Sequence, residues 1–295
     1  MNAVPREAGA VPLAPGTVTL PGAGAAASAR APHRPAPIAE SARAPLAFGR
    51  RTALAALGLA LLLGVWELVV RVGLVPALLM PPPSAIPPAF LREVAAGEWL
   101  FSVLASFRHY LTGLAIGSGL GVALGLAAGS SGTVDALIGW VVRLLRPIPG
   151  LAWIPFAILW FGVSPTGATF IVAIGVVWIN FFATHGAVRA VDRDLVEVAD
   201  AFGRRGFLDR LWTITLPAAS PAILAGFRTG VGQAWMAVVA AEIFGVPGLG
   251  QRMMQASSLL ATDVVVVYMA TMAALYGLFD TGTILVRDRL LRWQR

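Results

Sequence analysis

Six long apolar stretches constrain the fold of this chain more than any other feature. Each has about the 20 residues that a helix needs to cross the roughly 30 Å hydrocarbon core of a bilayer. Backbone groups find no water there, so each stretch must be helical. They cover residues 53–72, 107–129, 137–162, 167–186, 219–243 and 264–286. The sequence therefore predicts an all-α integral membrane protein with about six transmembrane helices.

The composition excludes a soluble globular protein. Hydrophobic residues make up 57% and charged residues only 13% of the 295 residues, and the mean hydropathy is +0.77. Soluble domains have roughly a quarter of charged residues. The net charge of +7 comes from arginines between apolar runs, which is typical of membrane proteins, so nucleic-acid binding is not expected. The chain has no cysteine, and its histidines lack ligand spacing, so neither a metal nor another cofactor is expected.

Residues 1–50 form a compositional region of their own. They are rich in Ala, Pro and Gly and show no helical periodicity of apolar residues. Such a segment buries too little surface to offset its chain entropy, so we expect a disordered tail. No long apolar run follows Arg6, so a cleaved signal peptide is not expected. The predicted domains are this tail, 1–50, and a transmembrane domain, 51–295.

Arginines flank the first and the last apolar stretch and predict the orientation of the chain. Because arginine concentrates on the cytoplasmic side of a membrane, both termini are expected in the cytoplasm of a bacterial cell, with the chain in its inner membrane. An even number of spans agrees with this. On the outer side, the proline-rich run Met80–Pro88 predicts a rigid connection, followed by an interfacial helix that ends near Trp99. The flanking arginines are Arg43, Arg50, Arg51, Arg287, Arg289, Arg292 and Arg295.

Glycines recur at every fourth position of the second apolar stretch, from Gly113 to Gly129. On a helix they form one groove that lets a second helix approach closely. The groove is expected either to pack against a helix of the same chain or to lie at a moving or subunit interface. The spacing leaves both open.

The segment Ala187–Pro217 is polar, with five acidic residues and five arginines, and is expected to be a cytoplasmic loop. Apolar residues at helical spacing predict a first short helix around residues 195–202, and Gly203 permits a sharp turn after it. A second amphipathic stretch starts at Phe207, and Pro217 is expected to help end it. These two helices are expected either to lie against their own bundle or to bind a partner.

A motif in this loop identifies a family. Glu197-Val198-Ala199-Asp200-Ala201-Phe202-Gly203, followed by Leu216-Pro217, resembles the EAA motif of permeases from binding-protein-dependent ABC importers, with Val198 where the family has Ala. Further strings from about Thr52 to the C-terminus resemble the nitrate, sulfonate, taurine and bicarbonate branch. They include Arg146-Pro147-Ile148-Pro149, Gly226-Phe227-Arg228, Ala240-Ala241-Glu242 and Thr262-Asp263-Val264.

The resemblance implies partners and a mechanism. The loop would form a coupling helix that seats in a groove of a separate ATPase subunit. Two permease copies and two ATPases would work with a periplasmic binding protein that delivers the solute. The chain would not be an enzyme, and without a lysine it cannot supply the phosphate-binding lysine of a Walker A loop. The residues implied in coupling are Glu197, Val198, Ala199, Asp200, Gly203, Leu216 and Pro217.

Polar side chains at membrane depth are candidates for the substrate pathway, because each is costly there unless it faces water, a ligand or a partner group. Arg228 is the natural group to attract an anion. The alternative is that Arg228 reaches toward the cytoplasmic surface or pairs with an acidic side chain. Tryptophans are open to a second interpretation too, as interface anchors or packing groups. The candidates are Asn180, Arg228, Gln233, Trp235 and Glu242.

The resemblance favours the permease of an importer for a small anionic solute. Sulfonates, including taurine, come first, and nitrate and bicarbonate follow. A stand-alone secondary transporter is the alternative; it would need no ATPase and would be expected to show an inverted repeat, which we do not detect. The size of the chain and the glycine groove favour assembly of two copies with two ATPase subunits.

Overall fold

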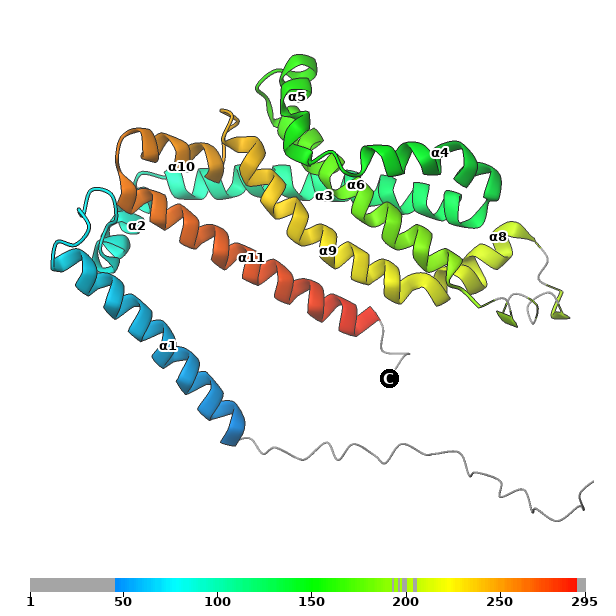
Figure 1. Cartoon of the computed structure of the whole chain (residues 1–295), viewed down its shortest axis with the longest axis horizontal. Coiled ribbons are helices and arrows are strands. Elements are labelled where there is room, and N and C mark those ends of the chain that lie inside the picture. Colours follow the sequence, from blue (N-terminus) through cyan, green and yellow to red (C-terminus); the bar gives the residue numbers. More distant parts are fainter. Residues whose placement is uncertain (1–45, 193, 196, 198–200, 204–205, 291–295) are drawn as a thin grey trace, which may run out of the picture. The chain divides into compact units, whose positions relative to one another are not determined.

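A computed structural model describes residues 46–290, except 193, 196, 198–200 and 204–205 (Figure 1). The chain divides into two units, residues 1–55 and 56–295. Of the first unit only the beginning of helix α1 (Leu46–Arg71) is described. All elements of the described residues are helices. Five of them are long and apolar enough to cross a membrane, and a bent helix pair makes a sixth if it counts as one span.

Helix α1 is the most exposed candidate span. Only 6% of the residues in its most apolar 18-residue stretch are buried, compared with 50% in the corresponding stretch of α6 (Pro165–Arg189). Since residues 53–66 of this helix carry no charged side chain and are apolar on every face, their surroundings must be apolar as well. The helix belongs in a lipid or protein environment rather than in water.

The proline-rich run leads into a short helix, as expected, but this helix ends earlier than predicted. It consists of η1 (Pro83–Ala85) and α2 (Ile86–Ala95), and two prolines occupy the first turn of α2. Gly97 has φ of 76°, a left-handed conformation that turns the chain. Trp99 therefore belongs to the next helix, α3 (Glu98–Ser130).

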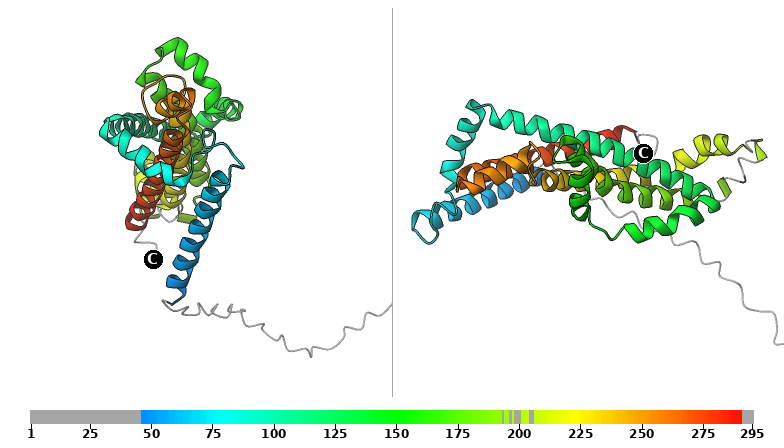
Figure 2. Two further views of the ribbon diagram at one scale, coloured as in Figure 1. Left: turned by 90° about the vertical axis from the view of Figure 1, so that its left-hand side faces the viewer. Right: turned by 90° about the horizontal axis from the view of Figure 1, so that it is seen from above.

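The glycine groove of α3 packs against α6 of the same chain, as Figures 1 and 2 show. A Cβ atom added to Gly117 would lie 2.5 Å from the carbonyl oxygen of Ala173, and one added to Gly121 would lie 2.5 Å from that of Val177. Contacts this short leave no room for a side chain. The intramolecular alternative is therefore confirmed, and this ridge is not available as a subunit interface.

The third apolar stretch is not one continuous helix, contrary to the prediction for 137–162. It consists of α4 (Gly132–Leu145), then η2 (Gly150–Trp153) with α5 (Ile154–Phe161), and the two parts are bent by 94°. The break contains Pro147 and Pro149, which have no N–H to donate, and Pro149 is extended with ψ of 145°.

The prediction that Pro217 helps to end a helix is wrong, because Pro217 lies inside one. The helix runs from α8 (Phe207–Arg210) through the π-turn η3 (Leu211–Thr215) into α9 (Leu216–Glu242). The N–H of Leu216 donates to the carbonyl of Leu211, five residues earlier. This wider turn accommodates a proline that has no N–H and whose ring crowds the preceding turn.

Helices α3, α6 and α9 form the centre of the second unit, and α10 (Leu249–Ser258) and α11 (Thr262–Leu290) pack on α3 and α9. The main apolar core lies among α3, α6, α9, α10 and α11 and includes Tyr110, Val176, Val238 and Tyr268. The polar side chains described next lie between these helices.

Candidate functional site

An ion pair joins the middle of α9 to the C-terminal half of α11. Arg228 Nε donates to Asp280 Oδ1 and Arg228 Nη2 to Asp280 Oδ2, each over 2.9 Å. The side chains are 39% and 30% exposed. Such a bidentate pair satisfies both charges at membrane depth. Of the alternatives for Arg228, pairing with an acidic side chain is what the structure contains.

Two pockets lie along the contact between α9 and α11. Pocket A, of about 330 Å³, lies among α3, α9 and α11, and Arg228 and Thr283 are among its lining residues. Pocket B, of about 400 Å³, is lined by α9 and α11 and includes Trp235 and Tyr276. Along α11, Asp280 lies between Tyr276 of pocket B and Thr283 of pocket A. Arg228 therefore lines pocket A, together with a second arginine, Arg287, and pocket B begins about one helical turn away on each helix.

Trp235 packs inside the protein beside these pockets. Its ring centroid lies 5.4 Å from that of Tyr110 and 5.4 Å from that of Phe279, in edge-on contacts with both. Tyr110 and Phe279 stack at 4.9 Å. This aromatic cluster joins α3, α9 and α11. Gln233, two residues before Trp235, is exposed.

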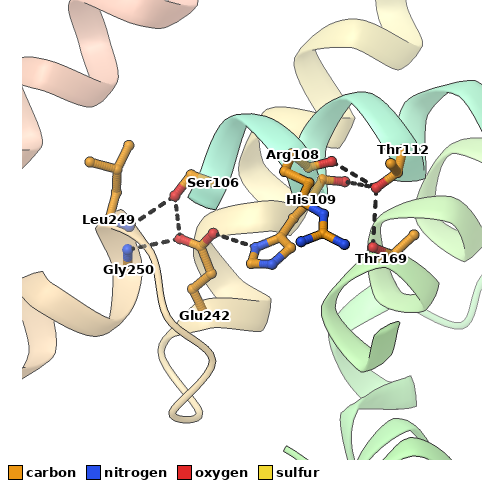
Figure 3. A network of polar contacts seen from close by, with 8 residues as sticks. All are labelled: Ser106, Arg108, His109, Thr112, Thr169, Glu242, Leu249 and Gly250. Carbon is orange, nitrogen blue, oxygen red and sulfur yellow. Dashed lines mark hydrogen bonds and ion pairs between the residues drawn. The ribbon is translucent and has the colours of Figure 1, made fainter. Parts of the chain in front are cut away.

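Glu242, at the end of α9, is fully buried in a polar network (Figure 3). One of its oxygens, Oε2, accepts hydrogen bonds from Ser106 Oγ over 2.7 Å and from the N–H of Gly250 over 3.0 Å. The other, Oε1, lies 3.0 Å from Nδ1 of His109. The Ser106 hydroxyl in turn accepts from the N–H of Leu249 over 2.8 Å. The carboxylate thus joins α3 to the end of α9 and the start of α10.

Sequence reasoning missed the partners of Glu242. The three histidines lack metal-ligand spacing, and the sequence offered no other reason to treat His109 as a site residue. The available signal was that Ser106 and His109 are three residues apart in an apolar helix and so share one face. Figure 3 also shows Thr112 on this helix, whose hydroxyl donates to the carbonyl of Arg108 over 2.7 Å and lies 3.2 Å from the hydroxyl of Thr169.

Asn180 lies on α6 in the packing between α3 and α9. Its Nδ2 donates to Ser118 Oγ over 3.2 Å and to the carbonyl of Val176 over 3.3 Å. Its side chain also lies against Gly121 and Gly230, whose missing Cβ atoms make room for it. Asn180 therefore joins three helices and is 1% exposed.

The predicted coupling residues are only partly described. Glu197 is helical and exposed, and Gly203 is exposed with φ of 79°, a conformation that a residue with a side chain rarely adopts. Leu216 and Pro217 lie at the start of α9. Val198, Ala199 and Asp200 are outside the described residues. Large apolar side chains near them are strongly exposed, namely Phe202, Phe207, Leu208 and Trp212.

A second group of ion pairs holds α2 at the opposite end of the helices. Arg252 of α10 donates to both oxygens of Glu93 over 3.0 Å each, and the hydroxyl of Tyr268 donates to Glu93 over 2.8 Å. Burial raises the pKa of Glu93, but the hydrogen bonds from Arg252 and Tyr268 lower it more, and the pKa is below its ordinary value. Arg92 pairs with Asp263 beside it.

No group of three His, Asp or Glu side chains suited to a metal ion occurs among the described residues. A further ion cluster joins α4 and α6. Asp135 lies 3.1 Å from Nε2 of His185 and 3.4 Å from Arg189. These contacts tie the end of α6 to α4.

Comparison with known proteins gives a consistent result. Residues 117–295 match the family described as "Binding-protein-dependent transport system inner membrane component". The chain is 36% identical over 234 residues to a protein of Escherichia coli named as an aliphatic sulfonates transport permease, covering 79% of this chain and 88% of that protein. It is 30% identical over 241 residues to the taurine transport system permease protein of the same species, covering 80% and 87%.

The fold is also similar to that of a solved transporter. A chain of the MetNI methionine ABC transporter, in an inward-facing conformation, superposes with a TM-score of 0.56 at 17% identity. The similarity covers 68% of this chain and 97% of that chain. At this identity the likeness concerns the fold alone.

Proposed function

This chain belongs to the family of inner membrane components of binding-protein-dependent transport systems, and from that membership we propose that it forms the passage through which an ABC importer takes up a small sulfonate-like solute. The chain is the permease subunit. A separate ATPase supplies the energy, and a periplasmic binding protein delivers the solute. The relatives named for aliphatic sulfonates and taurine, each matched over more than four fifths of its length, support this solute class.

The observation that carries the proposal is the placement of Arg228 in the lining of pocket A. A solute with a sulfonate group needs a cation at membrane depth, and guanidinium N–H groups match its oxygens. Arg228 is half exposed and lines pocket A. We assign Arg228 to the passage, Trp235 to its wall and Gln233 to an exposed position on α9. Asn180 and Glu242 hold the helices that shape it.

For the cytoplasmic side we propose that the loop at 187–217 docks on the ATPase. The exposed apolar side chains around Gly203 support this, because such side chains near one another on a surface mark a binding site. Glu197, Val198, Ala199, Asp200, Gly203, Leu216 and Pro217 are the proposed coupling residues. With this loop in the cytoplasm, an even number of spans and the flanking arginines favour a cytoplasmic position for both termini, including the tail at 1–50.

Two copies of the chain and two ATPase subunits complete the proposed complex. The passage forms between the two permease copies, and closure of the ATPases rocks the helix bundles between outward and inward access. The exposed apolar surface of α1 is suited to contact with lipid or with the second copy.

Reconstitution tests this function. The permease and its ATPase are reconstituted in vesicles, and the binding protein is added on the side opposite the ATPase. Uptake of labelled ethanesulfonate is then measured with ATP on the side of the membrane that carries the ATPase. We expect uptake that requires ATP and the binding protein, and none with an ATPase subunit that cannot hydrolyse ATP. Uptake by the permease alone would instead support a secondary transporter.

A further inference from the structure

The break between α4 and η2, residues 146–149, lies at membrane depth. Gly150, directly after it, packs against α6, where a Cβ added to Gly150 would lie 3.6 Å from the Cα of Gly175. Gly175 is near the middle of α6, a helix about 38 Å long, and the hydrocarbon core is roughly 30 Å thick. The turn from α4 to α5 that Figure 1 shows is therefore inside the membrane rather than at its surface.

The backbone of the break needs a hydrogen-bonding environment. All four residues of the break are exposed. Within the described part of the chain, no donor reaches the carbonyl oxygens of Pro147 and Ile148. Lipid cannot donate to such groups, so non-helical backbone at this depth occurs only inside protein or beside water. The break therefore faces either the second copy or a water-filled passage.

Arg146, the first residue of the break, brings a charge to this place. Its guanidinium lies over the ring of Phe182 on α6, 4.6 Å from the ring centroid. Phe182 is about two helical turns, or about 10 Å, from the end of α6 at Arg189. The ring holds the cation by its face and has no acceptor atom, so it uses none of the N–H groups of the guanidinium.

The two arginines at membrane depth differ in their partners. Asp280 matches the charge of Arg228, whereas no carboxylate of the described residues pairs with Arg146. A cation at this depth is stable when it contacts water or an anion. A water-filled passage satisfies both this cation and the free carbonyl oxygens of the break, whereas an apolar contact with the second copy would satisfy neither.

We propose that the break faces the water-filled passage and that Arg146 binds the anionic group of the solute there. The proposal rests on the proposed function and adds to the passage a second cation, separate from Arg228. A guanidinium donates two parallel N–H groups to an anionic group with several oxygens, such as a sulfonate. An anion at Arg146 separates no ion pair among the described residues, whereas an anion at Arg228 competes with Asp280.

The absence of cysteine from the sequence allows a direct test of the surroundings of the break. Ile148→Cys places one thiol at a position that is 37% exposed, and Leu62→Cys on α1, at 64%, is the control that contacts lipid or protein. Water-soluble methanethiosulfonate reagents modify a thiol only where it can ionise in water. The rates are measured on the reconstituted complex, with and without ATP.

We expect Ile148→Cys to react at least about tenfold faster than Leu62→Cys in one of the two states, because water reaches only the first thiol. Equal rates in both states would mean that the break is covered by protein or lipid and would overturn the proposal.

Two reagents of opposite charge test the role of Arg146 in the Ile148→Cys protein. Sulfonatoethyl methanethiosulfonate is an anion and trimethylammonioethyl methanethiosulfonate is a cation. We expect Arg146→Gln to lower the ratio of the anionic to the cationic rate roughly tenfold, because a charge-assisted contact is lost. Arg143→Gln is the matched control, since this arginine lies on the same helix and donates to the carbonyl of Gly139 over 2.9 Å. Its ratio should equal that of the parent.

Binding and transport complete the test. Ethanesulfonate should slow the modification of Ile148→Cys while Arg146 is present and should not slow it in Arg146→Gln. Uptake of ethanesulfonate should fall roughly tenfold in Arg146→Gln and remain mostly intact in Arg146→Lys, which keeps a cation.

An unchanged rate ratio in Arg146→Gln, with or without a loss of uptake, would overturn the proposal and leave Arg146 as a packing group between α4 and α6. If Arg146→Gln does not assemble, protection of Ile148→Cys by ethanesulfonate decides alone, and its absence would overturn the proposal. Normal uptake by Arg146→Gln contradicts this inference alone. A parent complex that moves no ethanesulfonate contradicts the proposed function.

Discussion

At the scale of single residues, three carboxylates between helices have donors from a different helix. Arg252 and Tyr268 donate to Glu93, Ser106 to Glu242, and Arg228 to Asp280. A carboxylate in such a place is stable only while its oxygens remain hydrogen-bonded, so removing it affects its partners as well. This dependence makes each carboxylate a fixed connection between two helices.

Glu242→Ala should destabilise the protein strongly. The change leaves the Ser106 hydroxyl and the Gly250 N–H buried without their acceptor, and we expect a loss of about 3–5 kcal/mol of unfolding free energy. Thermal unfolding of the purified protein in detergent measures it. Glu98→Ala, on an exposed residue of α3, is the control and should change stability by less than about 0.5 kcal/mol. Equal melting temperatures for the two variants would show that the network does not stabilise the fold.

The stabilisation from Glu93 should depend on pH. Because its pKa is lowered in the folded protein, its contribution is present above the ordinary value of 4.5 and is lost as the pH falls through the lower folded pKa. We expect Glu93→Gln to melt below the parent at neutral pH and the difference to shrink below pH 4.5. Melting curves of both proteins over this range are the measurement. A difference that stays constant with pH would contradict the role of the charge.

At the scale of elements, the contact between α3 and α6 depends on the absence of side chains along the groove of α3. Gly121→Leu should therefore force the helices apart and destabilise the protein by about 3 kcal/mol or more. Gly119→Leu is a close control, because an added Cβ there has no atom within 4 Å. Thermal unfolding compares them. Should both variants melt alike, the groove would not be a site of close packing.

The coupling loop gives a prediction about function rather than stability. Gly203→Trp should abolish transport and substrate-stimulated ATP hydrolysis while membrane insertion persists, because the new side chain is strained at φ of 79° and blocks the proposed docking surface. Gly132→Trp is the control, because Gly132 is exposed and a Cβ added there has no atom within 4 Å. This variant should transport like the parent. Normal stimulation of the ATPase by substrate in Gly203→Trp would argue against a coupling role.

At the scale of the whole molecule, this chain corresponds to a single chain of the MetNI transporter, of which it covers 97%. Helix α1 of this chain is largely exposed. We expect two permease copies to assemble with two ATPase subunits. Native mass spectrometry of the complex in detergent measures the stoichiometry. A stable complex of one permease with one ATPase would contradict this assembly. The glycine groove no longer supports it, since α6 of the same chain fills that groove.

The apolar runs and their lengths determined the membrane class and nearly all the long helices by themselves. A bilayer leaves the backbone only one way to satisfy its hydrogen bonds, so run length alone predicts a span. The same logic failed where prolines act locally. Pro149 breaks a stretch that appeared continuous, whereas Pro217 is accommodated by a π-turn, and hydropathy does not distinguish the two cases.

Only the tertiary structure decided which polar residues meet. Arg228 and Glu242 are visible in the sequence as costly charges, but their partners Asp280 and His109 lie 52 and 133 residues away. Spacing along a chain predicts contacts within one helix and not between helices, because the packing of whole faces sets the distances between them. For the same reason the glycine spacing predicted a close helix contact, while the identity of its partner, α6, came from the fold.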